Sequence, residues 1–107
     1  MEIQQYNLVL VNLDPTIGSE MKKTRPCAVI SPNEMNKYLQ TIVITPITST
    51  SRDYPTRVPI NQVRTKGWIV IDQIRTIDKR RVVKILGKLK NTEIEKVKNV
   101  IQETYVD

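Results

Sequence analysis

The chain contains no histidine among its 107 residues. Histidine is the side chain that most often acts as a general acid or base near neutral pH, and it is also the commonest metal ligand. Its absence excludes the Ser-His and Cys-His arrangements of many hydrolases. No Gly-rich phosphate loop, dinucleotide fingerprint or carboxylate cluster at metal-binding spacing stands in for it. Most enzyme classes are therefore disfavoured, and we expect neither a metal nor another cofactor.

Cysteine is almost absent as well, because Cys27 is the only one. A single cysteine allows no intrachain disulfide and no thiolate metal cage. Cys27 precedes the apolar run Ala28 to Ile30, and with no histidine to activate it we expect a small core residue rather than a nucleophile.

Long apolar runs are missing too. No stretch approaches the length needed to cross a bilayer, and the N-terminus has neither the basic region nor the apolar region of a signal peptide. We therefore expect a cytoplasmic protein with no membrane partner.

Large aromatic residues are scarce, with no Phe, one Trp and four Tyr. The core must then be built mainly from Val, Ile, Leu and Tyr, which is typical of a domain rich in strands. The length allows one hydrophobic core and is too short for two domains. We predict a single domain over residues 1–107.

What the chain does have is positive charge: 17 Lys and Arg against 11 Asp and Glu, a formal net charge of +6. Basic residues gather at 22–25, 75, 79–81 and 84–90. Such a surface favours a polyanion, because each phosphate neutralised by Lys or Arg releases condensed counterions. Nucleic acid is the leading class of partner, and a merely solvated basic surface is the alternative.

Short β-branched runs separated by turn residues predict an antiparallel, strongly curved sheet of the small-barrel kind. Ser31, as N-cap before Pro32, predicts a short helix over 32–38. Near the end, Thr92 and Glu95 form a capping-box pattern for an amphipathic helix. The strands are expected at 8–11, 27–30, 41–44, 58–60, 68–71 and 81–86, and the apolar face of the last helix at Ile94, Val97, Val100 and Ile101.

Two loop residues stand where chemistry could occur. Arg25 lies at the mouth of an apolar strand, where a planar guanidinium could be held toward a phosphate. Thr48 follows Pro46, which predicts an edge or a bulge that turns the threonine toward a groove. Each also has a simpler interpretation: Arg25 as the ion-pair partner of Glu20 or Asp72, and Thr48 as a loop-capping hydroxyl.

Three ordered motifs resemble the MazF/PemK/Kid family of bacterial toxins. The first runs Asp14-Pro15-Thr16-Ile17-Gly18-Ser19-Glu20 and then Lys23-Thr24-Arg25-Pro26-Cys27-Ala28-Val29-Ile30-Ser31. The second is Thr45-Pro46-Ile47-Thr48-Ser49, and the third is Asp72-Gln73-Ile74-Arg75-Thr76-Ile77-Asp78-Lys79. The likeness extends from about Tyr6 to Ile101. It implies an SH3-like barrel of twisted antiparallel strands with a C-terminal helix.

The resemblance also implies a function. Family members are endoribonucleases that cut single-stranded RNA at chosen sequences, work as homodimers, and are neutralised by an antitoxin whose disordered tail fills the RNA groove. Operator DNA is expected as a partner only of the toxin-antitoxin complex. The principal catalytic pair of the family corresponds to Arg25 and Thr48. Positions that line the substrate path in the family correspond to Ser19, Glu20, Asp72 and Gln73. We expect Ile17 and Tyr54 to add contact area for unstacked bases, and Ser49 and Arg75 to bind the substrate as well.

Such chemistry needs neither histidine nor metal, because a ribose 2′-OH can attack its own neighbouring phosphate once it is aligned and the developing charge is stabilised. Arg25 can stabilise the negative charge that develops on the phosphate, but its guanidinium stays protonated and cannot accept a proton. The general base is therefore expected to be Glu20 or Asp72. Some members have a His beside the catalytic Arg, where this chain has Thr24. The alternatives are a gyrase-binding toxin like CcdB, which uses its C-terminal helix, and an RNA binder without cleavage.

Overall fold

The computed structural model describes residues 1–13, 23–62 and 65–107, within which the chain forms seven strands and two α-helices. The strands are β1 (Asn7–Asn12), β2 (Thr24–Val29), β3 (Thr41–Thr48), β4 (Arg57–Asn61), β5 (Lys66–Val70), β6 (Arg75–Asp78) and β7 (Val82–Lys88). The helices are α1 (Asn33–Tyr38) and α2 (Asn91–Ile101), with short turns η1 (Ile71–Gln73) and η2 (Lys79–Arg81) and a π-helical end η3 (Gln102–Val106). None of the described helices is long and apolar enough to cross a membrane.

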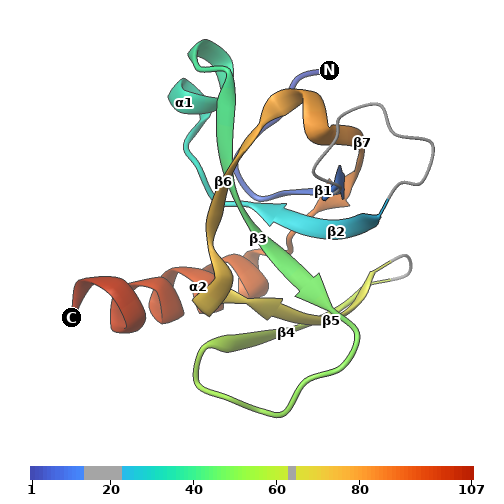
Figure 1. Cartoon of the computed structure of the whole chain (residues 1–107). Coiled ribbons are helices and arrows are strands. Elements are labelled where there is room, and N and C mark those ends of the chain that lie inside the picture. Colours follow the sequence, from blue (N-terminus) through green and yellow to red (C-terminus); the bar gives the residue numbers. More distant parts are fainter. Residues whose placement is uncertain (14–22, 63–64) are drawn as a thin grey trace.

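All strand pairs are antiparallel, in the order β4-β5-β3-β2-β1-β7, and β6 pairs with β3. The fold is thus mainly β with a C-terminal helix, as the sequence predicted. The long strand β3 is the centre of this arrangement (Figure 1), running from β6 at one end to the β4–β5 hairpin at the other.

The prediction of an edge or a bulge at Pro46 is wrong in one respect, because β3 is a central strand. Pro46 pairs with Cys27 of β2, and on the other side β3 changes partner there: Thr41–Ile44 pair with β6, and Ile47 and Thr48 pair with β5. In the gap, the Thr45 hydroxyl donates to the carbonyl of Val70. A residue without an N–H is tolerated in a gap between two ladders.

One hydrophobic core lies inside the curl of five strands. It takes alternate residues from β1, β2 and β3, such as Val9, Cys27 and Ile42, and one residue each from β6 and β7, Ile77 and Val82. This alternation is the period of two that places every second side chain on the same face. The strands β7, β1, β2, β3 and β6 therefore form a small barrel, and among the described residues no ladder joins β6 to β7.

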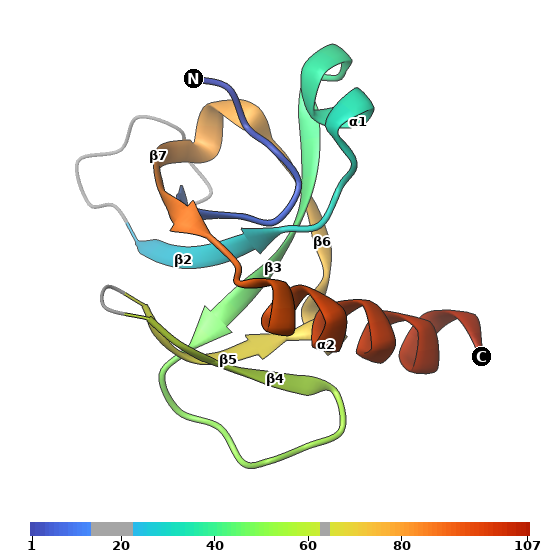
Figure 2. The same ribbon diagram turned by 180° about the vertical axis from the view of Figure 1, so that it is seen from behind.

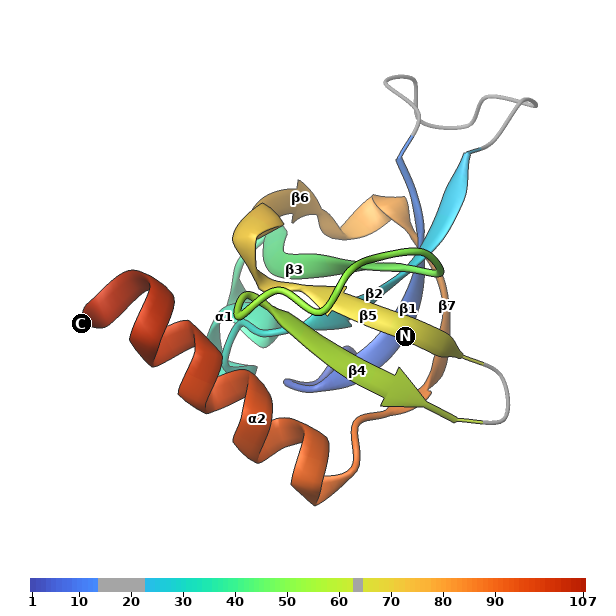
Figure 3. The same ribbon diagram turned by 90° about the horizontal axis from the view of Figure 1, so that it is seen from below.

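A second core fills the space between the sheet, the β4–β5 hairpin and α2. Ile47, Ile69 and Val58 contribute from three adjacent strands, and Val97 is fully buried beneath the helix. The predicted apolar face of the helix is confirmed, because the remaining members pack on this core: Ile94, Val100 and Ile101. Figure 2 shows α2 crossing the sheet, and Figure 3 shows it alongside β4.

The predicted helix starts need correction. The N-cap of α2 is Lys90, two residues before the expected Thr92, because the carboxylate of Glu93 accepts the Lys90 backbone N–H at 2.8 Å and also an N–H of Gln62 at 2.9 Å. Helix α1 is capped by Pro32 rather than Ser31. The Ser31 hydroxyl is used instead to accept the N–H of Val43 at 3.0 Å, which ties the helix to β3.

Candidate active site

The structure brings Arg25 and Thr48 together across two neighbouring strands. The β2–β3 ladder pairs Cys27 with Pro46, so two residues further along each strand Arg25 stands level with Thr48. Both line a hollow of about 210 Å³, which also includes Thr24, Pro26, Ile47, Ser49 and Lys66. Of the residues predicted from the sequence, this hollow unites Arg25, Thr48 and Ser49.

Arg25 is exposed, and among the described residues no carboxylate lies within ion-pair distance of it. The simpler interpretation of Arg25 as a partner of Asp72 is wrong, because Asp72 pairs with Arg57. A guanidinium without an intramolecular anion, at the rim of a hollow, is available to a phosphate.

Arg75 provides a second positive charge at this end of the barrel. It pairs with Ile44, so its side chain lies on the same side of the sheet as the barrel core. It too is exposed, and no acid of the described residues pairs with it. These two arginines, which have no acidic partner among the described residues and both act on the thiol of Cys27, favour an anionic ligand.

Cys27 lies beneath these arginines and is fully buried. Burial raises the pKa of its thiol to about 12, although the charges of Arg25 and Arg75 pull the pKa down. A thiol with so high a pKa is protonated at neutral pH and is a poor nucleophile. The expectation that Cys27 is a core residue is confirmed.

Thr48 is oriented by its own turn. Its hydroxyl donates to the carbonyl of Thr50 at 3.0 Å and accepts the Thr50 N–H at 3.4 Å. The loop-capping interpretation is therefore correct, and the same bonds hold the hydroxyl at the rim of the hollow. Gly67 of β5 approaches closely here: a Cβ on Gly67 would lie 2.1 Å from the carbonyl oxygen of Thr48.

Asp72 and Gln73 lie elsewhere, in the turn η1. The carboxylate of Asp72 accepts bonds from Thr56 at 2.8 Å and from Arg57 at 3.0 and 3.3 Å. Desolvation raises the pKa of Asp72, but the bonds from Thr56 and Arg57 outweigh it and leave the pKa below its usual value. Arg57 also stacks on Tyr54, 5.3 Å from the ring centroid. Asp72 thus belongs to a separate polar cluster.

The remaining predicted site residues, Ile17, Ser19 and Glu20, fall outside the residues that the structure describes. Two features could not be predicted from the sequence, because no motif includes the residues concerned. Lys66 lines the hollow, and Arg57 forms the ion pair with Asp72. Only the pairing of β4 with β5 and the turn η1 bring them into place.

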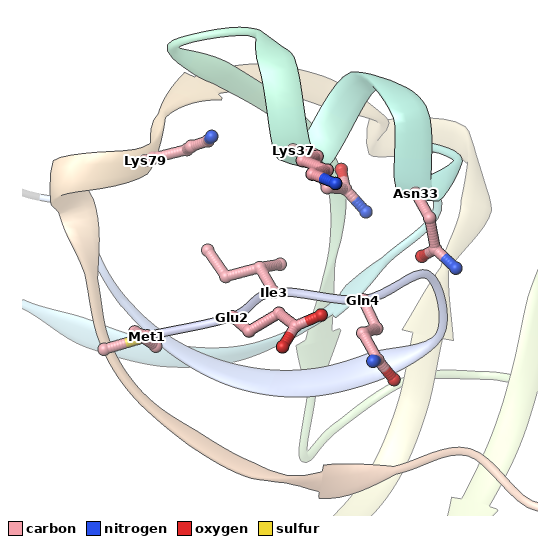
Figure 4. Close-up of a pocket in the computed structure, with 8 residues that line it drawn as sticks. Met1, Glu2, Ile3, Gln4, Asn33, Lys37 and Lys79 are labelled. Atoms are coloured by element: carbon pink, nitrogen blue, oxygen red, sulfur yellow. The ribbon is translucent and has the colours of Figure 1, made fainter.

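A second, larger hollow of about 580 Å³ lies between the N-terminal segment, α1 and η2. Figure 4 shows Lys79 and Ile3 beside this space, and it contains none of the predicted site residues. Among the described residues, no group of three or more Cys, Asp or Glu side chains is placed to hold a metal ion.

Comparison with known proteins finds similarity to toxins. A model of the family described as PemK-like, MazF-like toxins of type II toxin-antitoxin systems matches residues 4–105. The endoribonuclease MazF of Staphylococcus saprophyticus is 33% identical over 105 residues, covering 92% of this chain and 88% of the relative.

Solved structures agree in fold. The MazE-MazF structure of Deinococcus radiodurans is similar with a TM-score of 0.82 and 24% identity, over 96% of this chain and 95% of that one. An endoribonuclease of mycobacterial species in complex with its cognate antitoxin has a TM-score of 0.82 and 20% identity, over 94% and 92% of the two chains.

Proposed function

Since the chain belongs to the PemK-like, MazF-like toxins of type II toxin-antitoxin systems, we propose that it is an endoribonuclease that cleaves single-stranded RNA at a specific sequence. Cleavage of messenger RNA would inhibit translation and growth. The observation that carries the proposal is the hollow that Arg25, without an acidic partner among the described residues, lines together with Thr48.

The reaction is an internal displacement at phosphorus. The ribose 2′-oxygen attacks the neighbouring phosphate, loses its proton to a general base, and expels the 5′-oxygen, which takes up a proton. The products are a 2′,3′-cyclic phosphate and a 5′-hydroxyl. Arg25 stabilises the charge on the phosphorane, and the Thr48 hydroxyl turns from the Thr50 carbonyl to a phosphate oxygen.

We propose Glu20 as the general base. Of the two acids expected from the sequence, Asp72 is bonded through both carboxylate oxygens to Arg57 and does not line the hollow. A carboxylate held in this way has a low pKa and is a weak base. No step needs a metal ion, since the substrate supplies the nucleophile.

The substrate path extends from the hollow in both directions. Ser49 offers a hydroxyl inside it, and Arg75 offers a second phosphate contact toward the barrel. Asp72 and Gln73 stand farther along, where polar groups can read base edges. We propose Ile17 and Ser19, which belong to the motif before β2 in the sequence, as further substrate contacts.

The partners follow from the same family. Mycobacterial and Deinococcus relatives have been solved with an antitoxin, and we propose a cognate antitoxin that covers this basic site. We further propose a homodimer, cytoplasmic action on messenger RNA, and binding to operator DNA only together with the antitoxin.

The test is cleavage of a long single-stranded RNA in the presence of EDTA, with the new 5′ ends mapped by primer extension. We expect discrete cuts at one short motif. Arg25→Ala should slow cleavage by about 10² to 10³, the usual cost of removing one charge-stabilising donor. Loss of activity with EDTA would contradict the metal-independent mechanism.

A matched control is Arg80→Ala, which removes an exposed arginine whose partner is the adjacent Asp78 at 2.9 Å. Residue 78 pairs with Thr41, at the opposite end of β3 from Thr48. This variant should cleave at the wild-type rate. Absence of cuts from folded wild-type protein would refute the proposal, and inhibition of gyrase supercoiling would then identify a toxin with a protein target.

A further inference from the structure

Trp68 lies next to the catalytic pair, although no motif includes it. The β3–β5 ladder pairs Thr48 with Trp68, and the β5–β4 ladder pairs Trp68 with Pro59. The preceding pair, Ile47 with Ile69, points into the second core. Because strand residues alternate in direction, Thr48 and Trp68 lie together on the opposite face.

Arg25 of β2 adds a residue from a fourth strand to the paired residues Thr48, Trp68 and Pro59, since the β2–β3 register brings Arg25 level with Thr48. Four strands thus contribute one residue each to a row across the sheet, which we call the site row: Arg25, Thr48, Trp68 and Pro59. Neighbours in such a row have Cβ atoms about 5 Å apart. A phosphate bound by Arg25 and Thr48 is therefore close enough for an attached nucleotide to reach Trp68.

Trp68 is a large aromatic residue that neither core uses. It is partly exposed and belongs to neither hydrophobic cluster. Among the described residues its indole N–H finds no hydrogen-bond acceptor, whereas the N–H of a buried tryptophan usually has one. The residue thus keeps both a ring surface and a donor for a ligand.

The surroundings of Trp68 suit a nucleotide. Lys66 lies two residues earlier on the same face of β5 and lines the hollow. An aromatic ring beside a cation is the usual platform for an unstacked base, with the charge following the phosphates.

We propose that Trp68 stacks on the RNA base adjacent to the scissile phosphate and thereby determines where the strand is held for cleavage. The inference rests on the proposed ribonuclease function and adds a specificity-determining residue to it. Pro59 extends the platform, and the indole N–H is available to a base edge or a phosphate oxygen.

Trp68 is the only tryptophan in the chain, so tryptophan fluorescence, excited at a wavelength that the four tyrosines do not absorb, reports on it alone. The first experiment titrates the wild-type protein with a 2′-O-methyl RNA, which cannot be cut because its 2′-oxygen is blocked. We expect quenching by this strand, and little quenching by a strand of equal length without bases. Anisotropy of end-labelled strands measures binding separately, so bound RNA that leaves the fluorescence unchanged overturns the proposal.

The second experiment measures kcat/KM for Trp68→Leu and Trp68→Tyr on an RNA containing the mapped cut site. Loss of one base stack should lower the value for Trp68→Leu by roughly 5- to 150-fold. Trp68→Tyr keeps an aromatic face and should recover most of the activity. Tyr38→Leu removes an aromatic side chain that is 73% exposed at the end of α1, and it should change nothing.

An abasic substitution next to the cut separates stacking from a structural effect. On this abasic RNA, kcat/KM of the wild-type protein should fall by the same factor by which Trp68→Leu lowers kcat/KM on the intact RNA. The kcat/KM of Trp68→Leu itself should be the same on both RNAs. If Trp68→Leu is folded by circular dichroism and cleaves normally, the stacking proposal fails while the ribonuclease function stands. If the wild type cuts no RNA, the proposed function fails, and the fluorescence titration still decides the stacking.

Discussion

Arginine residues of this protein differ in what surrounds them, and that difference separates their roles. Arg57 and Arg80 each pair with a carboxylate, Asp72 and Asp78. Arg25 has no such partner among the described residues and stands at the hollow with Thr48. A paired guanidinium has its donors occupied, whereas Arg25 can direct its planar donors to a phosphate.

Thr48 should act through its hydroxyl. We expect Thr48→Ala to lower kcat/KM on the mapped RNA by at least about tenfold, since it removes one phosphate donor from the transition state. Thr48→Ser keeps the oxygen and its turn and should stay within a few-fold of wild type. Equal losses in the two variants, with unchanged thermal unfolding, would mean that the methyl group matters rather than the hydroxyl.

Asp72 should make stability depend on pH. Its pKa is lowered in the folded protein, so its contribution is present above the unfolded pKa near 3.8 and is lost as pH falls through the folded value. Asp72→Asn should therefore be less stable than wild type at pH 7, by less than about 1 kcal/mol because the pair is partly exposed.

Urea unfolding of both proteins between pH 7 and pH 2 measures this effect. The difference in unfolding free energy between them should shrink once the pH falls below about 4. A gap that stays constant down to pH 2 would show that the charge of Asp72 does not stabilise the fold.

Strand β3 is the element that builds the site. Its first half closes the barrel with β6, and its last residues join the β4–β5 hairpin. Thr48 therefore lies at the end of β3 that adjoins the second hydrophobic core, beyond the residues that contribute to the barrel core. Close contact with β5 at this point is possible only because residue 67 has no side chain.

Gly67→Ala should damage the site through this contact. A Cβ would lie 2.1 Å from the Thr48 carbonyl oxygen at a φ of +143°, so backbone must shift. We expect a loss of stability of at least about 1 kcal/mol and a loss of cleavage greater than the fraction unfolded accounts for. Thermal unfolding and kcat/KM on the same preparation measure both.

Gly87→Ala is the matched control, because this glycine has a φ of +157° but a Cβ added to it would have no heavy atom within 4 Å. It tests backbone strain without the contact to Thr48. Its folded fraction should cleave at the wild-type rate. Equal losses of activity in both variants would contradict the role given to the contact.

At the scale of the whole molecule, the net charge of +6 favours encounter with RNA. Affinity that depends on phosphate contacts falls with salt, with a slope of about −0.7 per contact for single strands. Arg75→Ala should therefore reduce the salt slope of binding to 2′-O-methyl RNA by about one contact. Arg80→Ala should leave it unchanged, and equal slopes for all three proteins would exclude Arg75 from the RNA path.

Local pattern alone identified much of the fold. Short β-branched runs predicted six of the strands, and the spacing of Ile94, Val97, Val100 and Ile101 predicted the buried face of α2. These signals are local, because alternation and helical periodicity depend on neighbouring residues. The motifs around Arg25 and Thr48 indicated the candidate pair without any knowledge of their distance.

Other features depended on contacts between distant segments. Strand β6 (Arg75–Asp78) is short and polar, and only its pairing with β3 makes it a strand. Likewise, α2 begins where Glu93 meets Gln62, 31 residues away.

The sequence by itself determined the strand-rich composition, the helix face, the basic charge and the motifs of the active pair. Only the tertiary structure decided that Asp72 is held by Arg57, 15 residues away, and that Trp68 stands beside Thr48. The physical reason is strand register: a shift of one residue turns every side chain to the other face, and no local preference specifies it.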